Sequence, residues 1–138
     1  MRVSINLQMD GFWRDCNKRW VPIVAGLYCV YSCTNNPDSG TVLLHRLLYI
    51  GQSEDTNRRL AEHERMSDWR SVLEEGQELC YSVAQLDTKQ DRDIAEAALV
   101  YIAKPPFNVA LKDSFSESPV TIIVSGAIGL LPPSVVLG

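Results

Sequence analysis

The chain has 138 residues, of which 46% are hydrophobic and 22% are charged, a composition typical of one globular domain and unlike that of a disordered chain. Its net charge of -4 argues against a protein that binds nucleic acid by electrostatics alone, because such binding needs clustered Lys and Arg. Residues 1–70 hold nine Lys/Arg against eight Asp/Glu, whereas residues 71–138 hold four against nine, so we expect a polyanion to contact the first half of the chain.

The first predicted elements are an arm and a hairpin. Residues 1–25 mix aromatic and charged side chains without a clean period, and we expect an N-terminal arm laid over the domain. The segment GLYCVYSC is rich in aromatic and small apolar residues, as strands are. It ends at the turn-forming sequence NNPDSG, and a second apolar segment, TVLLHRLLYIG, follows at once. These two segments predict an antiparallel hairpin.

Three helical segments are predicted next, with a strand between the second and the third. Asp55 or Thr56 is available as the N-cap of a first helix, and a short second helical stretch covers residues 69–75. The segment ELCYSVAQL predicts a third strand. Thr88, with Asp91 three residues later, predicts the start of a last helix that continues until the next prolines.

The C-terminal segment and the cysteines bear on cellular location. Residues 118–138 are uncharged, but prolines and glycines interrupt them, which predicts a strand and an apolar tail in place of a membrane span. The four cysteines lack the spacing of a zinc ribbon, and charged residues near the N-terminus argue against a signal peptide. We therefore expect a cytoplasmic protein with free thiols.

Glu96 is the only charged residue between Ile94 and Ala103, in a helix that is apolar nearly all round. A carboxylate buried there loses its hydration, so a cation should face it. Arg92, one turn earlier, is one candidate and would make Glu96 structural. A divalent metal is the other, because Mg²⁺ is commonly held by one or two carboxylates with waters and substrate phosphate.

Arg59 and His63 lie four residues apart and therefore on one face of the first predicted helix. An arginine fork matches a phosphate, and a histidine one turn away can move a proton near neutral pH. The alternative is a solvated surface on which Arg58 and Arg59 pair with Glu62 and Glu64. The spacing alone does not decide between these two interpretations.

Tyr28 and Tyr49 lie one on each strand of the predicted hairpin. Aromatic residues are common in strands, so cross-strand packing is their simplest interpretation. Gly51 stands where the second strand gives way to the helix, and a glycine there lets a ligand or another backbone come close.

Together these residues resemble the signature of the GIY-YIG nuclease family. Residues 26–28, Gly-Leu-Tyr, resemble its first half, and residues 49–51, Tyr-Ile-Gly, are its second half. The resemblance covers residues 26–108. Four further positions match the family in order: Arg59, His63, Glu96 and Asn108.

The resemblance implies a metal-dependent endonuclease that hydrolyses DNA phosphodiester bonds, with one Mg²⁺ or Mn²⁺ ion held by Glu96. It implies that Tyr28 and Tyr49 lie beside the attacking water and that Arg59 stabilises charge on the phosphoryl group. His63 would relay a proton to or from Tyr28, and Asn108 would position the loop after the last helix. The residues expected to contact the substrate are Gly51, Gln52, Arg58 and Asn108.

Two positions depart from the family's pattern. Leu27 replaces the commonest isoleucine, which is conservative in volume, and Gln52 stands where many relatives carry a lysine, which removes a charge close to the phosphate. The alternative function is therefore a catalytically weak module that binds nucleic acid or protein. The extensions on either side are too short for a separate DNA-binding domain, so specificity would come from this domain, from a homodimer or from a partner protein.

These observations predict an α+β domain in which a small antiparallel sheet, of about three central strands, is flanked by helices. We expect an N-terminal arm over residues 1–25, a catalytic module over residues 26–108 and a C-terminal extension over residues 109–138. The extension should pack on the same domain, and a strand near residues 120–124 should add to the catalytic module.

Overall fold

The first half of the first strand alternates between buried and exposed residues. The computed structural model, which describes residues 1–138, places Ile5, Leu7 and Met9 in the core and the residues between them in solvent. The elements in chain order are β1 (Val3–Arg14), η1 (Asp15–Trp20), β2 (Gly26–Asn36), β3 (Thr41–Ser53), α1 (Thr56–Ala61), α2 (Met66–Ser71), β4 (Glu78–Gln85), α3 (Lys89–Ala103), β5 (Val120–Gly126) and β6 (Ser134–Leu137).

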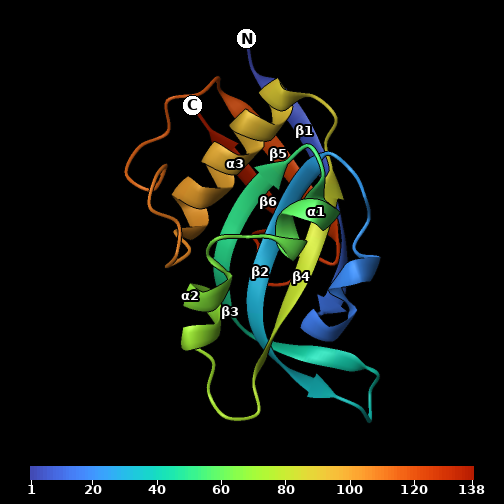
Figure 1. The fold of residues 1–138 in the computed structure, drawn as a ribbon. Helices are drawn as coiled ribbons and strands as arrows, with labels where there is room; N and C mark the ends of the chain where they lie inside the picture. Colours follow the sequence, from blue (N-terminus) through green and yellow to red (C-terminus); the bar gives the residue numbers. More distant parts are fainter.

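All six strands form one mixed sheet in the order β3-β2-β4-β1-β5-β6. Each neighbouring pair is antiparallel except β1 and β5, which run parallel with Val3 opposite Val120. The sheet curls into a half-barrel, and Figure 1 shows α1 and α2 as short helices and α3 as the long one. Strands hold 40% of the residues and helices 24%.

The predicted sheet of about three antiparallel strands flanked by helices is therefore wrong. Three further strands complete the sheet, and the segment expected as an arm over the surface is β1, which lies between β4 and β5. The sequence does carry a signal for this strand, because Val3, Ile5, Leu7 and Met9 alternate with polar residues at the two-residue period of a half-buried strand. The strand expected near residues 120–124 is present as β5.

The predicted hairpin and helix caps agree with the structure. β2 and β3 pair antiparallel over their whole length. The Asp55 side chain accepts a hydrogen bond from the Arg58 amide at the start of α1, and Thr88 accepts one from the Asp91 amide at the start of α3. The second short helix begins earlier than expected, at Met66. None of the helices combines the length and the apolar character needed to cross a membrane.

The sheet has a hydrophobic core on each face. One core joins α3 to β1, β5 and β6, and it contains the buried thiols of Cys29, Cys33 and Cys80, which are free. The other core lies under α1 and α2 and is built around Tyr28, Trp69 and their neighbours. Because β3 is at the edge of the sheet and contacts both α1 and α3, its C-terminal half adjoins helices from both faces.

Candidate active site

Tyr28 and Tyr49 stack on the α1 face of the hairpin. Their ring centroids are 6.2 Å apart with an interplanar angle of 29°. Gly51 lies directly opposite Tyr28 in the strand register. A Cβ atom at Gly51 would stand 2.4 Å from the Tyr28 ring and 2.9 Å from that of Tyr49, so only glycine lets the two phenols pack over this backbone.

His63 contacts Tyr28 with one ring nitrogen and the backbone with the other. Its Nε2 lies 2.9 Å from the Tyr28 hydroxyl, and its Nδ1 accepts a hydrogen bond of 3.0 Å from the Arg65 amide. Because Nδ1 is an acceptor, the proton of the neutral imidazole is on Nε2, and His63 donates it to the Tyr28 oxygen. The hydroxyl proton of Tyr28 is then free to point elsewhere.

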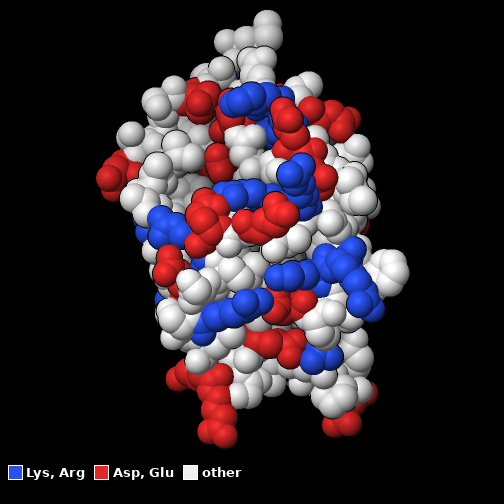
Figure 2. Space-filling view, in the orientation of Figure 1, with Lys and Arg blue, Asp and Glu red and all other residues white.

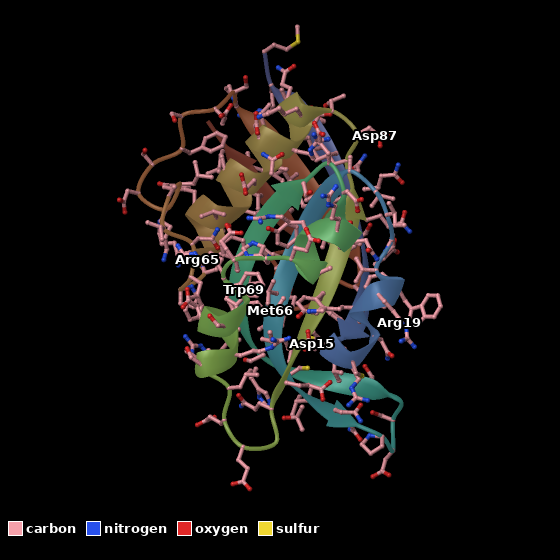
Figure 3. All side chains as sticks on the ribbon, viewed as in Figure 1. Asp15, Arg19, Arg65, Met66, Trp69 and Asp87 are labelled. Atoms are coloured by element: carbon pink, nitrogen blue, oxygen red, sulfur yellow. The ribbon has the colours of Figure 1, made fainter.

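Trp69 completes this aromatic cluster, and sequence reasoning did not identify it. The indole is fully buried and lies 4.4 Å from the His63 ring and 5.3 Å from the Tyr49 ring, measured between centroids. Figure 3 shows Trp69 and Met66 at α2, which delivers the indole to the sheet. The tryptophan therefore holds the imidazole in the position from which it bonds Tyr28.

Burial of His63 should make the stability of the protein depend on pH. Burial, with the nearby charge of Arg59, lowers the pKa of His63 from 6.5 to about 4. The unfolded chain therefore binds up to one more proton at this residue than the folded chain between pH 6.5 and 4, so the contribution of His63 to stability is complete above pH 6.5 and is lost as the pH falls towards 4. We expect the free energy of unfolding to fall by up to about 3 kcal/mol over this window. Urea titrations at several pH values check this, and the dependence should flatten in His63→Gln.

Arg59 extends from α1 and is held by an acidic neighbour. Its guanidinium makes two hydrogen bonds to the Glu64 carboxylate, of 2.5 and 2.8 Å, and the side chain remains about one-third exposed. Arg58 points into solvent, 3.7 Å from Glu62. The pairing of Arg58 and Arg59 with glutamates, which was one of the two interpretations of this segment, is thus present. Both arginines also line an open hollow of about 240 Å³ between the end of β3 and α1.

Glu96 has no cationic partner in the structure. Arg92 was the sequence-based candidate, but its guanidinium donates to the carbonyls of Leu86 and Asp87 and to Oε1 of Gln52. Glu96 instead lies 3.4 Å from the amide nitrogen of Gln52. The interpretation of Glu96 as a structural partner of Arg92 is therefore wrong, and the half-buried carboxylate keeps unsatisfied acceptor capacity.

Gln52 links the buried guanidinium to two carboxylates. Its Oε1 accepts from Arg92 at 3.2 Å, while its Nε2 donates to Asp93 at 2.5 Å and to Glu96 at 3.4 Å. Arg92 is only 3% exposed, so its charge is felt strongly at this position. Arg92 therefore places a buried positive charge next to Gln52 from α3.

The charges of Glu96 and Arg59 both act on the two phenols. Burial raises the pKa of both Tyr28 and Tyr49. The charge of Glu96 raises both pKa values further, and the charge of Arg59 opposes it at both rings. Burial also raises the pKa of Glu96, and the charge of Asp93 adds to that shift. Side chains from β2, β3, α1 and α3 thus act on one another around the aromatic cluster.

The chain holds no cluster of three or more His, Cys, Asp or Glu side chains suited to a metal ion. Glu96 is the one free carboxylate beside the phenols, since Asp93 pairs with Lys89 at 2.9 Å. A single carboxylate fits Mg²⁺ or Mn²⁺ where waters and a substrate phosphate complete the coordination. This donor set suits a metal that binds together with its substrate, and it does not suit a permanent structural ion.

Asn108 is buried and fastens the chain after α3 to the edge of the sheet. Its amide accepts from the Ile50 backbone nitrogen at 3.0 Å and donates to the Ile50 carbonyl at 2.8 Å. The Phe107 amide also bonds the Leu48 carbonyl, so residues 107 and 108 pair with the otherwise open edge of β3. Asn108 therefore holds the strand that carries Tyr49 and Gly51, and its expected contact with substrate stays a prediction.

Comparison with known proteins gives one partial match. A stretch of 69 residues is 35% identical to UvrABC system protein C of Fervidobacterium nodosum. The stretch is 49% of this chain but only 12% of that protein. No protein-family model matches the chain, and no solved structure matches it. The chain is thus similar to a small part of a UvrABC system protein.

Proposed function

We propose that this chain is a GIY-YIG-type endonuclease that hydrolyses DNA phosphodiester bonds with the aid of one divalent metal ion. The observation that carries the proposal is the packing of Tyr28, Tyr49 and His63 in one cluster on which the charges of Arg59 and Glu96 both act. The partial similarity to UvrABC system protein C supports a link to DNA.

Tyr28 is the residue proposed to handle the attacking water. Its oxygen accepts a hydrogen bond from His63, so its own hydrogen is directed away from the imidazole. The same bond favours the phenolate of Tyr28, which is the form that can take a proton from water, and so works against the burial that raises the pKa of this hydroxyl. His63 thus acts as a fixed donor and not as a proton relay, because Nδ1 is occupied by the Arg65 amide. Tyr49 packs beside Tyr28 and is the more accessible phenol.

Arg59 is proposed to bind the phosphoryl oxygens. An arginine presents two parallel N–H donors that match a carboxylate or a phosphate equally well. In the structure Glu64 occupies both donors, and its carboxylate is largely exposed. A substrate phosphate can therefore take the place of the Glu64 carboxylate, and the glutamate holds Arg59 in position until that exchange.

Glu96 is the residue that would hold the metal, with Gln52 orienting its carboxylate. The ion supplies, when bound, positive charge for the phosphoryl and leaving oxygens. Asp93 adds negative charge close by, which favours cation binding at this end of α3. The mutual repulsion of these carboxylates is a second reason for a cation here.

A catalytically weak binding module is the second candidate function. The observation in its favour is that Glu64 already satisfies the guanidinium of Arg59 through two short hydrogen bonds. A site whose arginine stays with its glutamate would bind nucleic acid without stabilising the transition state.

An assay of cleavage separates the two functions. Purified protein is incubated with single-stranded, nicked and duplex DNA, with Mg²⁺, Mn²⁺ or EDTA, beside Arg59→Ala. We expect metal-dependent products from the native chain, and a rate at least about 100-fold lower from Arg59→Ala, because a charge-stabilising donor is lost. Absence of products from the native chain with every substrate and metal, together with equal DNA binding by both proteins, would favour the binding module.

A further inference from the structure

We propose that Trp20 and Arg19, at the C-terminal end of η1, form a platform on which an unpaired base of the nucleic-acid substrate stacks. This inference rests on the proposed function, because it names the class of substrate that the site would receive. It concerns a surface outside the cluster of Tyr28, Tyr49 and His63.

Trp20 is unusual among the tryptophans of this chain. It is 66% exposed, whereas Trp69 is fully buried. The guanidinium of Arg19 lies 5.4 Å from the centre of its ring. Stacking of a planar base on an exposed indole is favourable because it removes both faces from water. An adjacent cation strengthens the stacking of a base that carries a phosphate.

The charge of Arg19 is uncompensated, unlike that of its basic neighbours. Lys18 and Arg70 both pair with Asp15, at 3.7 and 2.9 Å. Arg19 forms no ion pair with any carboxylate, and its side chain is exposed. Figure 3 shows Arg19 at the outer side of η1, on the opposite flank of the sheet from Arg65 and Trp69. The guanidinium is therefore free to meet the phosphate of a nucleotide whose base lies on Trp20.

The platform is fastened to the helix that carries Arg59. The amide nitrogen of Asn57 donates to the carbonyls of Arg19 and Val21, at 3.0 and 2.7 Å. Thr56 bonds the carbonyls of Pro22 and Val24, each at 2.9 Å. These four hydrogen bonds fix the end of η1 and the segment that follows it to the first turn of α1. A base held at Trp20 would therefore lie in a set position relative to Arg59.

The chemistry of this surface favours unpaired nucleotides over duplex. A base can stack on an indole only when its face is exposed, as in a single strand, an overhang or a flap. Duplex binding relies mainly on phosphate neutralisation by clustered basic residues. Figure 2 shows acidic (red) and basic (blue) side chains interleaved on this face, and the chain carries a net charge of -4. Electrostatic attraction alone would therefore bind a duplex weakly.

Binding of a fluorescein-labelled 12-nucleotide oligo(dT) tests the proposal, with a blunt duplex of equal length as the second probe and EDTA present to prevent cleavage. We expect Trp20→Ala to weaken oligo(dT) binding about tenfold, within the range found for loss of one stacked base. Trp20→Phe, which keeps an aromatic face, should bind within about threefold of the native chain. Ile23→Ala is the matched control, because Ile23 is 75% exposed three residues further on and has no stacking face. It should bind oligo(dT) as the native chain does.

Several outcomes would overturn the stacking platform. Native affinity of Trp20→Ala for oligo(dT) is one, and an equal loss of affinity for duplex and oligo(dT) is another. A change in self-association of Trp20→Ala in sedimentation runs, without a change in oligo(dT) binding, would assign the surface to a second copy of the chain. If the native chain cleaves DNA while Trp20→Ala binds normally, only the platform fails. If Trp20 governs binding but no metal supports cleavage, the platform stands and the hydrolytic function fails.

Discussion

Replacing Glu96 with glutamine is expected to reduce cleavage by about 10³-fold or more while leaving the fold intact. The amide keeps the volume of the side chain but cannot hold a divalent ion, and loss of metal assistance costs several kcal/mol in the transition state. Burial raises the pKa of Glu96, which means that its charged form is disfavoured in the folded chain. The neutral glutamine should therefore unfold at the same urea concentration as the native protein or at a higher one.

Asp93→Asn provides the matched control for this prediction. Asp93 lies on the same helix and also accepts a hydrogen bond from Gln52, but it pairs with Lys89. We expect this variant to cleave within about tenfold of the native rate. Loss of the Asp93 charge should change the activation free energy by about 1 kcal/mol, which corresponds to less than a tenfold change in rate. Rates are measured at matched Mg²⁺ or Mn²⁺ concentrations. Native cleavage by Glu96→Gln would exclude the metal role of this carboxylate.

Trp69→Ala is expected to lower the free energy of unfolding by about 3–5 kcal/mol, the cost of removing a large aromatic side chain from a core. The indole is fully buried and contacts both His63 and Tyr49, so its loss leaves a cavity directly under the cluster. Urea denaturation followed by circular dichroism measures the change. DNA cleavage should also fall in conditions where the variant is folded, because the His63 ring loses the surface that orients it.

Two comparisons separate packing from hydrogen bonding at Trp69. The indole nitrogen has no hydrogen-bond partner in the structure, so Trp69→Phe loses no bond and should be clearly less destabilising than Trp69→Ala. Trp20→Ala removes an equal volume from an exposed position and should change stability by less than about 0.5 kcal/mol. A loss of stability in Trp20→Ala as large as that in Trp69→Ala would contradict this account of the core.

Local signals in the sequence predicted the elements better than their assembly. The hairpin, the Asp55 and Thr88 caps and the strand near residues 120–124 all follow from turn residues, caps and apolar segments that act over a few positions. The six-stranded sheet depends on pairings between distant segments. Val3 on β1 pairs with Val120 on the adjacent strand β5, and no short-range sequence pattern specifies that pairing.

The candidate site was predicted in part. Motif positions identified Tyr28, Tyr49, Arg59, His63 and Glu96, and the structure brings the first two and His63 into contact. The partners of these residues were less accessible to sequence reasoning. Glu64, five residues after Arg59, was named only as one of two possible surface partners of the arginines, and Trp69 was assigned only to a helical stretch. Their roles depend on side-chain direction after a turn, which spacing does not report.

The position of the first strand affects the order in which this chain can fold. β1 is synthesised before the other strands, yet its two neighbours in the sheet are β4 and β5, which lie much later in the sequence. Closing such long loops costs entropy before any contact repays it, so non-local strand pairing is slow compared with a hairpin. We therefore expect β2 and β3 to assemble early and β1 to be inserted late. Until then, the apolar side chains of Ile5, Leu7 and Met9 have no surface to cover them.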